Sequence, residues 1–180
     1  DATHVLPMLL HDYHKRGKDI DLPCYGEPKL NGVKVLSTKL SETEMKYRSK
    51  TGISYDKVCA HWTPHLLPMM HVGEIWDGEG FNPDKSLQWH SRHAKRVRDD
   101  QEDLHLWVYD GGYVDMSQVK RSDRYTDAIP GPCLPTWDGK LTHPDAHPMI
   151  KKLAVEYIRV ESQLKPTHDR YVGWGFEGLV

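Results

Sequence analysis

The sequence predicts an α+β fold with mostly antiparallel sheet. Several short segments rich in strand-forming residues are separated by turn residues, and few segments carry apolar residues at helical spacing. The 180 residues show no internal repeat and no glycine-serine linker. We therefore expect a single domain over residues 1–180, which is long enough to bury a core.

The first half of the chain predicts one helix followed by strand pairs. Residues 8–18 have the pattern of a short helix. Residues 25–36 predict a strand, a turn at Asn31-Gly32 and a second strand, because Asn-Gly readily supplies the positive φ angles of a tight hairpin. Residues 45–55 predict a further strand pair that turns near Thr51-Gly52. These pairs give the predicted sheet its antiparallel character.

The second half predicts strands first, then a loop-rich passage and a helix. Residues 71–81 predict another extended element, and residues 104–110 alternate like a half-buried strand. Proline and glycine crowd residues 129–148, which predicts loops. Residues 150–164 carry apolar side chains close to helical spacing and predict the second helix.

Composition excludes several classes of protein. With 24 basic and 26 acidic residues the net charge is -2, so a nucleic-acid contact has to come from a local patch. No apolar run is long enough to cross a bilayer, and the first residues lack the pattern of a secretory signal. The three cysteines cannot all pair and show no disulfide framework, which favours a reducing compartment. We expect a cytoplasmic protein that does not contact membranes.

Residues 90–98 form the most basic stretch, with four fixed positive charges, and the acidic residues 99–103 follow at once. On pattern alone this stretch is typical of a solvated helical face. The alternative is a local contact with nucleic-acid phosphates. The basic side chains are those of Arg92, Lys95, Arg96 and Arg98.

The twelve histidines also raise the question of zinc. The densest group is Cys59, His61, His65 and His71, whose spacing matches no familiar structural zinc site. Scattered surface or core histidines are therefore favoured over a zinc site. Cys59 is interpreted as a small buried residue, since no histidine and asparagine pattern indicates a nucleophile.

Three signatures follow one another along the chain. They are Glu27-Pro28-Lys29-Leu30-Asn31-Gly32-Val33-Lys34, Trp76-Asp77-Gly78-Glu79 and Gly175-Phe176-Glu177-Gly178-Leu179-Val180. Lys-Leu-Asn-Gly alone would be an ordinary hairpin with a surface lysine. Together, the order and spacing resemble the covalent nucleotidyltransferases, which comprise ATP-dependent DNA ligases, RNA ligases and mRNA capping enzymes. The resemblance covers nearly the whole chain and is closest to compact phage and viral DNA ligases.

This resemblance implies a nucleotidyltransferase (adenylylation) fold, with mostly antiparallel sheets flanked by helices and ATP-grasp-like. It implies that Lys29 attacks the α-phosphate of ATP and carries AMP covalently, which requires a lysine with a lowered pKa. The family segment typically reads Lys-x-Asp-Gly-x-Arg, and here Asn31 and Lys34 replace the aspartate and arginine. Lys34 keeps the charge but loses the two-pronged donor geometry of arginine.

The resemblance also implies roles for other residues. Glu27 would read the adenine amino group, although alone it is typical of a surface carboxylate at a strand start. Tyr109 would stack on the base, although alone it is typical of a core tyrosine in a strand. Glu79 and Glu177 would hold the ribose and Mg²⁺ or Mn²⁺, and both are implied to be catalytic together with Lys29. The implied nucleotide-binding residues are Glu27, Lys29, Leu30, Lys34, Lys50, Glu79, Tyr109 and Glu177. The implied DNA-binding residues are Lys34, Arg92, Lys95, Arg96 and Arg98.

Lys50 enters this set because Ser49-Lys50-Thr51-Gly52 resembles a Ser-Arg-x-Gly segment of the family, with Arg48 as an alternative cation. The implied function is an ATP-dependent DNA ligase. It would be a monomer that seals nicked duplex DNA through lysyl-AMP and an adenylylated 5′-phosphate, in replication or repair in a phage or bacterial host. An RNA ligase or capping guanylyltransferase with the same lysine chemistry remains an alternative. A non-catalytic nucleotide- or DNA-binding module is a further one.

In the family, a strand with a Lys-x-Lys pair and an oligonucleotide-binding (OB) domain follow the third signature. Neither lies within these 180 residues. We therefore expect a nucleotidyltransferase domain that lacks its last strand, rather than a divergent protein that lost catalysis. Such a chain is expected to bind nucleotide but to self-adenylylate and seal nicks poorly.

Overall fold

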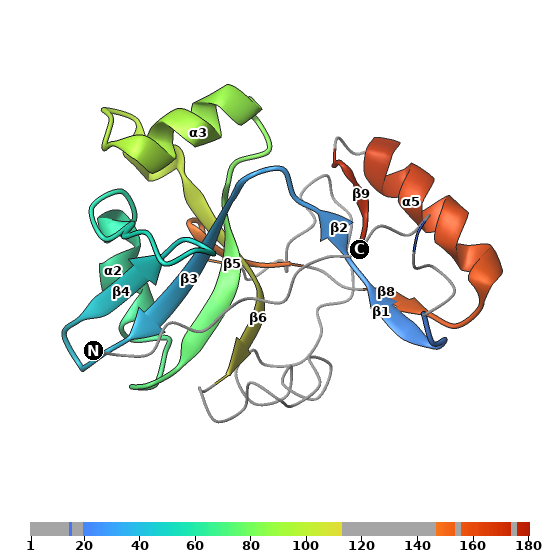
Figure 1. Cartoon of the computed structure of the whole chain (residues 1–180), viewed down its shortest axis with the longest axis horizontal. Coiled ribbons are helices and arrows are strands. Elements are labelled where there is room, and N and C mark those ends of the chain that lie inside the picture. Colours follow the sequence, from blue (N-terminus) through green and yellow to red (C-terminus); the bar gives the residue numbers. More distant parts are fainter. Residues whose placement is uncertain (1–14, 16–19, 113–146, 154–155, 174–175) are drawn as a thin grey trace.

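The computed structural model describes residues 15, 20–112, 147–153, 156–173 and 176–180. A five-stranded sheet dominates this part of the chain, with the order β4-β3-β5-β6-β7 (Figure 1). Its strands are β3 (Val33–Lys39), β4 (Met45–Arg48), β5 (Ile75–Phe81), β6 (His105–Gly112) and β7 (Ile150–Lys152). Only the β6–β7 pair is parallel among these described strands. The predicted α+β class with mostly antiparallel sheet is confirmed.

Two small ribbons join the beginning of the chain to its end. Strand β1 (Cys24–Gly26) pairs with β8 (Glu156–Ile158), and β2 (Pro28–Lys29) pairs with β9 (Gly178–Leu179). Helix α5 (Leu164–Gly173) follows the short 3-10 helix η5 (Glu161–Gln163). In Figure 1 these ribbons and α5 gather on one side of the five-stranded sheet. The chain passes from β2 in a ribbon directly into β3 in the sheet.

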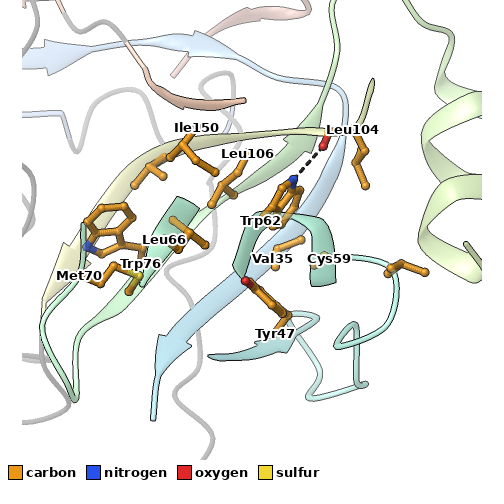
Figure 2. Close-up of a cluster of buried hydrophobic side chains, with 12 residues drawn as sticks. Val35, Tyr47, Cys59, Trp62, Leu66, Met70, Trp76, Leu104, Leu106 and Ile150 are labelled. Atoms are coloured by element: carbon orange, nitrogen blue, oxygen red, sulfur yellow. Dashed lines mark hydrogen bonds between the residues drawn. The ribbon is translucent and has the colours of Figure 1, made fainter. Parts of the chain in front are cut away.

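Two apolar clusters cover the opposite faces of the sheet. Along β6, Leu106 and Val108 belong to one cluster and Trp107 to the other, because successive strand residues point to opposite faces. The first cluster packs under η2 (Ala60–Trp62) and α2 (Thr63–Leu66), where the indole of Trp62 donates a 2.8 Å hydrogen bond to the Leu104 carbonyl (Figure 2). The second cluster joins the sheet to the ribbons and α5 through Leu30, Phe81, Trp107, Leu153, Tyr171 and Phe176.

Helix α3 (Leu87–Lys95) leads from the end of β5 towards η3 (Gln101–Asp103). Its N-cap is Ser86, whose hydroxyl accepts a hydrogen bond from the Trp89 backbone at 3.1 Å. The helix ends at Arg96, which has an extended backbone. Helix α3 therefore carries Arg92 and Lys95 of the basic stretch, and Arg96 and Arg98 follow the helix.

The predicted hairpin over residues 25–36 is wrong. Residues 28–29 and 33–39 are strands, but β2 pairs with β9, whereas β3 pairs with β4 and β5. Gly32 does not have the positive φ angle of a hairpin turn. Partners distant in sequence replace the local pairing that Asn-Gly favours.

The predicted helix over residues 150–164 is also wrong. The segment contains β7, β8 and η5, and α5 begins only at Leu164. Ile150 and Ile158 are buried by pairing with β6 and β1, so the apolar spacing reflects two short strands.

Residues 45–55 give β4 and one isolated bridge, between Arg48 and Ser54, in place of a second strand. The predicted helix over 8–18 and the loops over 129–148 lie almost wholly outside the described residues.

Within the described ranges, no helix combines the length and apolar character that crossing a membrane requires. Cys24 and Cys59 are both free thiols, and Cys133 lies outside the described residues.

Candidate active site

Lys29 ends strand β2 and lies opposite Gly178 of β9. Its Nζ is 2.9 Å from Oε2 of Glu177, and the two side chains are 39% and 45% exposed. The ε-ammonium is thus accessible and yet held by a carboxylate. The structure therefore brings together the lysine and the last glutamate that the signatures single out.

Backbone pairing fixes this contact. The amide of Glu177 donates to the Lys29 carbonyl at 3.2 Å, and Glu27 and Val180 exchange two backbone hydrogen bonds of 2.8 and 2.9 Å. The first and third signatures are therefore locked in register. Glu27 is only 5% exposed, so it is not a surface carboxylate at a strand start.

Glu79 connects the second signature to the first. It lies between Lys34 of β3 and Trp107 of β6 in the strand register. Its Oε2 accepts a 2.9 Å hydrogen bond from the Gly32 amide. Burial raises the pKa of Glu79 to about 7, although the Gly32 bond and the charges of Lys34 and Lys29 lower it. Glu79 is thus a carboxyl group that changes charge near neutral pH.

The glycines of the first two signatures allow this close approach. A Cβ on Gly32 would lie 2.4 Å from the Gly80 carbonyl oxygen, and one on Gly78 would lie 2.3 Å from that of Trp107. The β5–β6 register shifts between Asp77 and Gly78. Both positions therefore require glycine because backbone atoms occupy the space of a side chain.

Lys34 is held against Asp77 and Tyr109. Its Nζ lies 3.2 Å from Oδ2 of Asp77 and 5.1 Å from the centre of the Tyr109 ring. Cations bind favourably to aromatic faces at this range. Tyr109 is partly exposed. Asp77 is a site residue that sequence reasoning missed, although it stands within the second signature.

The remaining predicted nucleotide contacts lie at the edges of this group. Arg48 donates to Oδ1 of Asp56 at 2.8 Å, which holds its side chain at the end of β4. Lys50 is exposed just beyond β4, at the end of the sheet where Lys34 lies. Leu30 packs in the second apolar cluster and is only 6% exposed.

Apart from Lys34 on β3, the predicted DNA-binding residues lie on α3 and the segment after it. Arg92, Lys95 and Arg96 are exposed, and Arg98 is half-buried. The Phe81 ring at the end of β5 stacks on the His90 ring of α3, with the two ring centres 5.3 Å apart. The strand that carries Glu79 therefore also supports the basic helix.

The donors near the site suit a hard divalent cation better than zinc. Glu79 and Glu177 offer carboxylate oxygens, the ligands that Mg²⁺ prefers, usually with phosphates and water. Within the described part of the chain, no three histidine, cysteine, aspartate or glutamate side chains gather as a metal site. His61 instead contacts the Leu104 carbonyl at 2.8 Å, and burial raises the pKa of the Cys59 thiol.

Comparison with known proteins shows that the chain is similar in fold to several solved structures. No family model matches the chain, and no curated protein matches its sequence. A solved structure named Pmar-Lig_PreS3 superposes with a TM-score of 0.71 at 19% identity, over 95% of this chain and 40% of that one. The Chlorella virus DNA ligase-adenylate gives a TM-score of 0.55 at 19% identity, over 97% and 58% of the two chains.

A Lig E DNA ligase, described as binding DNA with a minimal scaffold, gives a TM-score of 0.56 at 12% identity, over 98% of this chain and 60% of that one. The chain thus spans between two and three fifths of the length of these structures. The DNA ligase-like fold implied by the three signatures is confirmed.

Proposed function

We propose that this chain is the nucleotidyltransferase domain of an ATP-dependent DNA ligase and that Lys29 takes AMP from ATP. The observation that carries the proposal is the meeting of three distant signatures. Glu177 contacts the Lys29 amine, and Glu79 is bound by the backbone beside it. The ligase-like fold supports the same conclusion.

In the proposed reaction, the lone pair of Lys29 Nζ attacks the α-phosphorus of ATP. A P–N bond forms, the bond from the α-phosphorus to the bridging oxygen breaks, and pyrophosphate leaves with that electron pair. The amine has to lose a proton before or during attack. Glu177 Oε2 lies 2.9 Å from this nitrogen and would accept the proton, which leaves the lone pair of Nζ free to attack.

Mg²⁺ or Mn²⁺ held by Glu79 and Glu177 would neutralise phosphate charge and favour pyrophosphate as leaving group. The chain's own groups would position the nucleotide. Glu79 would accept hydrogen bonds from ribose hydroxyls, Tyr109 would stack on adenine and Glu27 would bind its amino group. Lys34 and Lys50 would attract the phosphates.

AMP would then pass to the 5′-phosphate of a nick, and the 3′-hydroxyl would displace it to restore the phosphodiester bond. The duplex would be bound by phosphate contacts from Lys34 and from the basic surface of α3. Lysine and arginine contacts of this kind dominate affinity for DNA and weaken as salt rises.

Self-adenylylation tests the proposal. The chain is incubated with α-labelled ATP and Mg²⁺, and covalent label is followed on denaturing gels and by intact mass. We expect weak labelling of the wild type, none of Lys29→Ala, and wild-type labelling of Lys57→Ala, a matched change at an exposed lysine away from the site. Label retained by Lys29→Ala would refute the proposed nucleophile.

An RNA ligase or guanylyltransferase is the second candidate, because Asn31 stands where DNA ligases carry aspartate. Competition between ATP and GTP for label transfer, followed by nicked DNA against nicked RNA, separates the two. Preference for GTP or nicked RNA would favour the second candidate. Absence of any covalent adduct would instead favour a non-catalytic binding module.

A further inference from the structure

Two buried histidines lie three residues apart on α3. Their hydrogen-bonding partners differ, because His90 faces one donor and one acceptor whereas His93 faces two acceptors. His90 is 1% exposed and His93 is 3% exposed. Neither is part of the group around Lys29. The partners of each ring decide which of its nitrogens carries a proton.

His90 makes one donor and one acceptor contact. Its Nδ1 lies 2.6 Å from the Ser86 carbonyl oxygen, which can only accept. Its Nε2 accepts a 2.9 Å hydrogen bond from the Asn82 amide and therefore carries no proton. These contacts require the neutral ring. Burial lowers the pKa of His90, in agreement with this assignment.

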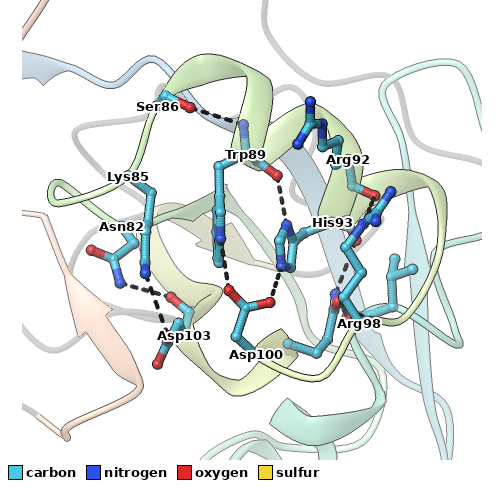
Figure 3. Close-up of polar contacts among 11 residues, drawn as sticks. Asn82, Lys85, Ser86, Trp89, Arg92, His93, Arg98, Asp100 and Asp103 are labelled. Carbon is cyan, nitrogen blue, oxygen red and sulfur yellow. Dashed lines mark hydrogen bonds and ion pairs between the residues drawn. The ribbon is translucent and has the colours of Figure 1, made fainter.

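His93 faces acceptors on both sides. Its Nδ1 lies 2.7 Å from the Trp89 carbonyl oxygen, and its Nε2 lies 2.6 Å from Oδ1 of Asp100 (Figure 3). The hydrogen bond from His93 lowers the pKa of Asp100 to about 2, with a further bond from the Trp89 indole, so Asp100 is ionised. Both ring nitrogens of His93 therefore donate, which makes the ring an imidazolium cation.

The stacking on Trp89 is compatible with this charge. The His93 ring stacks on the indole of Trp89, with the ring centres 3.7 Å apart and an interplanar angle of 22°. The Lys85 ammonium lies 5.4 Å from the same ring, and Figure 3 shows the indole between the two side chains. Aromatic faces attract cations, and indole does so most strongly.

The segment that follows α3 is tied back to the helix by the contact between His93 and Asp100 and by further hydrogen bonds. The Arg98 guanidinium donates to the Arg92 carbonyl at 3.3 Å, and its amide donates to the Gln101 side chain at 3.1 Å. Gln101 in turn donates to the His93 carbonyl at 2.9 Å. Arg98 is thereby tied to the end of α3, and the Asp100 carboxylate is turned onto His93 and Trp89.

We infer that His93 is a positioning residue for DNA phosphates. As an imidazolium it holds Asp100 in place and keeps Arg92, Arg96 and Arg98 arranged at the end of α3. The inference rests on the proposed function, because it assumes that this surface binds duplex DNA. Loss of one proton leaves a ring nitrogen facing an acceptor, which releases Asp100, loosens residues 96–100 and exposes a negative charge to the duplex.

The charged and titratable groups around His93 are few. Asp100 faces it from the segment before η3, His90 lies one turn earlier on α3, and Lys85 lies across the Trp89 indole. Arg98 adds its charge at the helix end. Because an uncharged His93 cannot donate to both of its acceptors, the inference predicts that duplex affinity falls as pH rises.

Imidazole ¹⁵N spectra of the 180-residue chain test the charge assignment directly. We expect His93 to show two protonated nitrogens at neutral pH and His90 to show a proton on Nδ1 alone. A singly protonated His93 overturns the inference and leaves the proposed ligase function standing. Fluorescence anisotropy with a labelled nicked duplex then tests the consequence.

Two aspartate-to-asparagine variants, at Asp100 and at its neighbour Asp99, are expected to differ in duplex affinity. Asp100→Asn removes a negative charge and should still weaken binding, by about tenfold, the scale of one or two lost phosphate contacts. Its matched control is Asp99→Asn at the exposed neighbour, which should leave binding unchanged or tighter. Asp100→Asn and His93→Gln should also abolish the fall of affinity with pH, whereas His90→Gln should preserve it.

Tighter binding by Asp100→Asn, or an unchanged pH profile in Asp100→Asn and His93→Gln, overturns the inference. A wild-type chain with no salt-dependent duplex affinity overturns the proposed DNA contact as well as this role of His93. AMP labelling of Lys29 is measured in parallel and should not respond to Asp100→Asn. That measurement distinguishes a loss of duplex binding from a loss of Lys29 adenylylation.

Discussion

The side chain of Glu177 has one role in the structure and a second role in the proposed reaction. In the structure it neutralises Lys29 at 2.9 Å, and in the proposed reaction it would also support metal and phosphate. Its removal would free the amine but would also take away charge stabilisation of the transition state. The second effect dominates, because one well-placed electrostatic group contributes about 10²-fold to 10³-fold in rate.

We therefore expect Glu177→Gln to slow labelling of Lys29 by at least about 100-fold, with little change in thermal stability. Glu161→Gln, at an exposed glutamate of η5, is the matched control and should label like the wild type. The measurement is the initial rate of AMP transfer from labelled ATP. Faster labelling by Glu177→Gln would show that the ion pair only restrains the lysine.

Glu79 makes stability depend on pH in the metal-free protein. Burial raises its pKa from 4.5 to about 7, so between these values the folded state keeps a proton that the unfolded state has lost. The free energy of unfolding should therefore fall as pH rises through this window. Urea denaturation across the window, with chelator present, measures the effect. In Glu79→Gln this contribution should disappear, and an unchanged pH profile would contradict the raised pKa.

At the scale of elements, β5 depends on glycine at its bulge. A Cβ on Gly78 would press on the Trp107 carbonyl of β6, and neither backbone can move without disturbing the sheet. We expect Gly78→Ala to destabilise the fold by about 1–3 kcal/mol, the usual cost of overpacking. Denaturant unfolding followed by tryptophan fluorescence measures the change.

Gly173 is the matched control for this substitution. A Cβ there meets nothing within 4 Å, and the residue ends helix α5. Gly173→Ala should therefore be neutral or stabilising by up to about 1 kcal/mol, because alanine favours helix more than glycine. Equal losses of stability in the two variants would contradict the argument from backbone contact.

The success of sequence reasoning differed between elements for a physical reason. Residues 75–81 and 105–112 form the predicted strands because their alternation matches a sheet with two differently packed faces. Residues 150–158 were mistaken for helix because two short buried strands produce a similar apolar spacing. The hairpin failed because β2 pairs with a strand near residue 178, which local turn propensity cannot reveal.

At the scale of the whole molecule, the candidate site joins three distant parts of the chain. The order of the signatures indicated Lys29, Glu79 and Glu177, and the fold brings Glu177 to Lys29 and the Gly32 amide to Glu79. The roles of Asp77 against Lys34 and of Asp100 against His93 were not predictable. Both depend on side-chain geometry between residues whose contact only the folded chain creates.

The pairing of β2 with β9 has a consequence for biosynthesis. Lys29 leaves the ribosome long before Glu177 does, so the nascent chain carries a lysine that still lacks its carboxylate neighbour. The contact forms only after residues 176–180 have been translated and have docked beside residues 28–29. Such long-range closure is slow compared with local folding, and the reactive centre therefore matures as a late event.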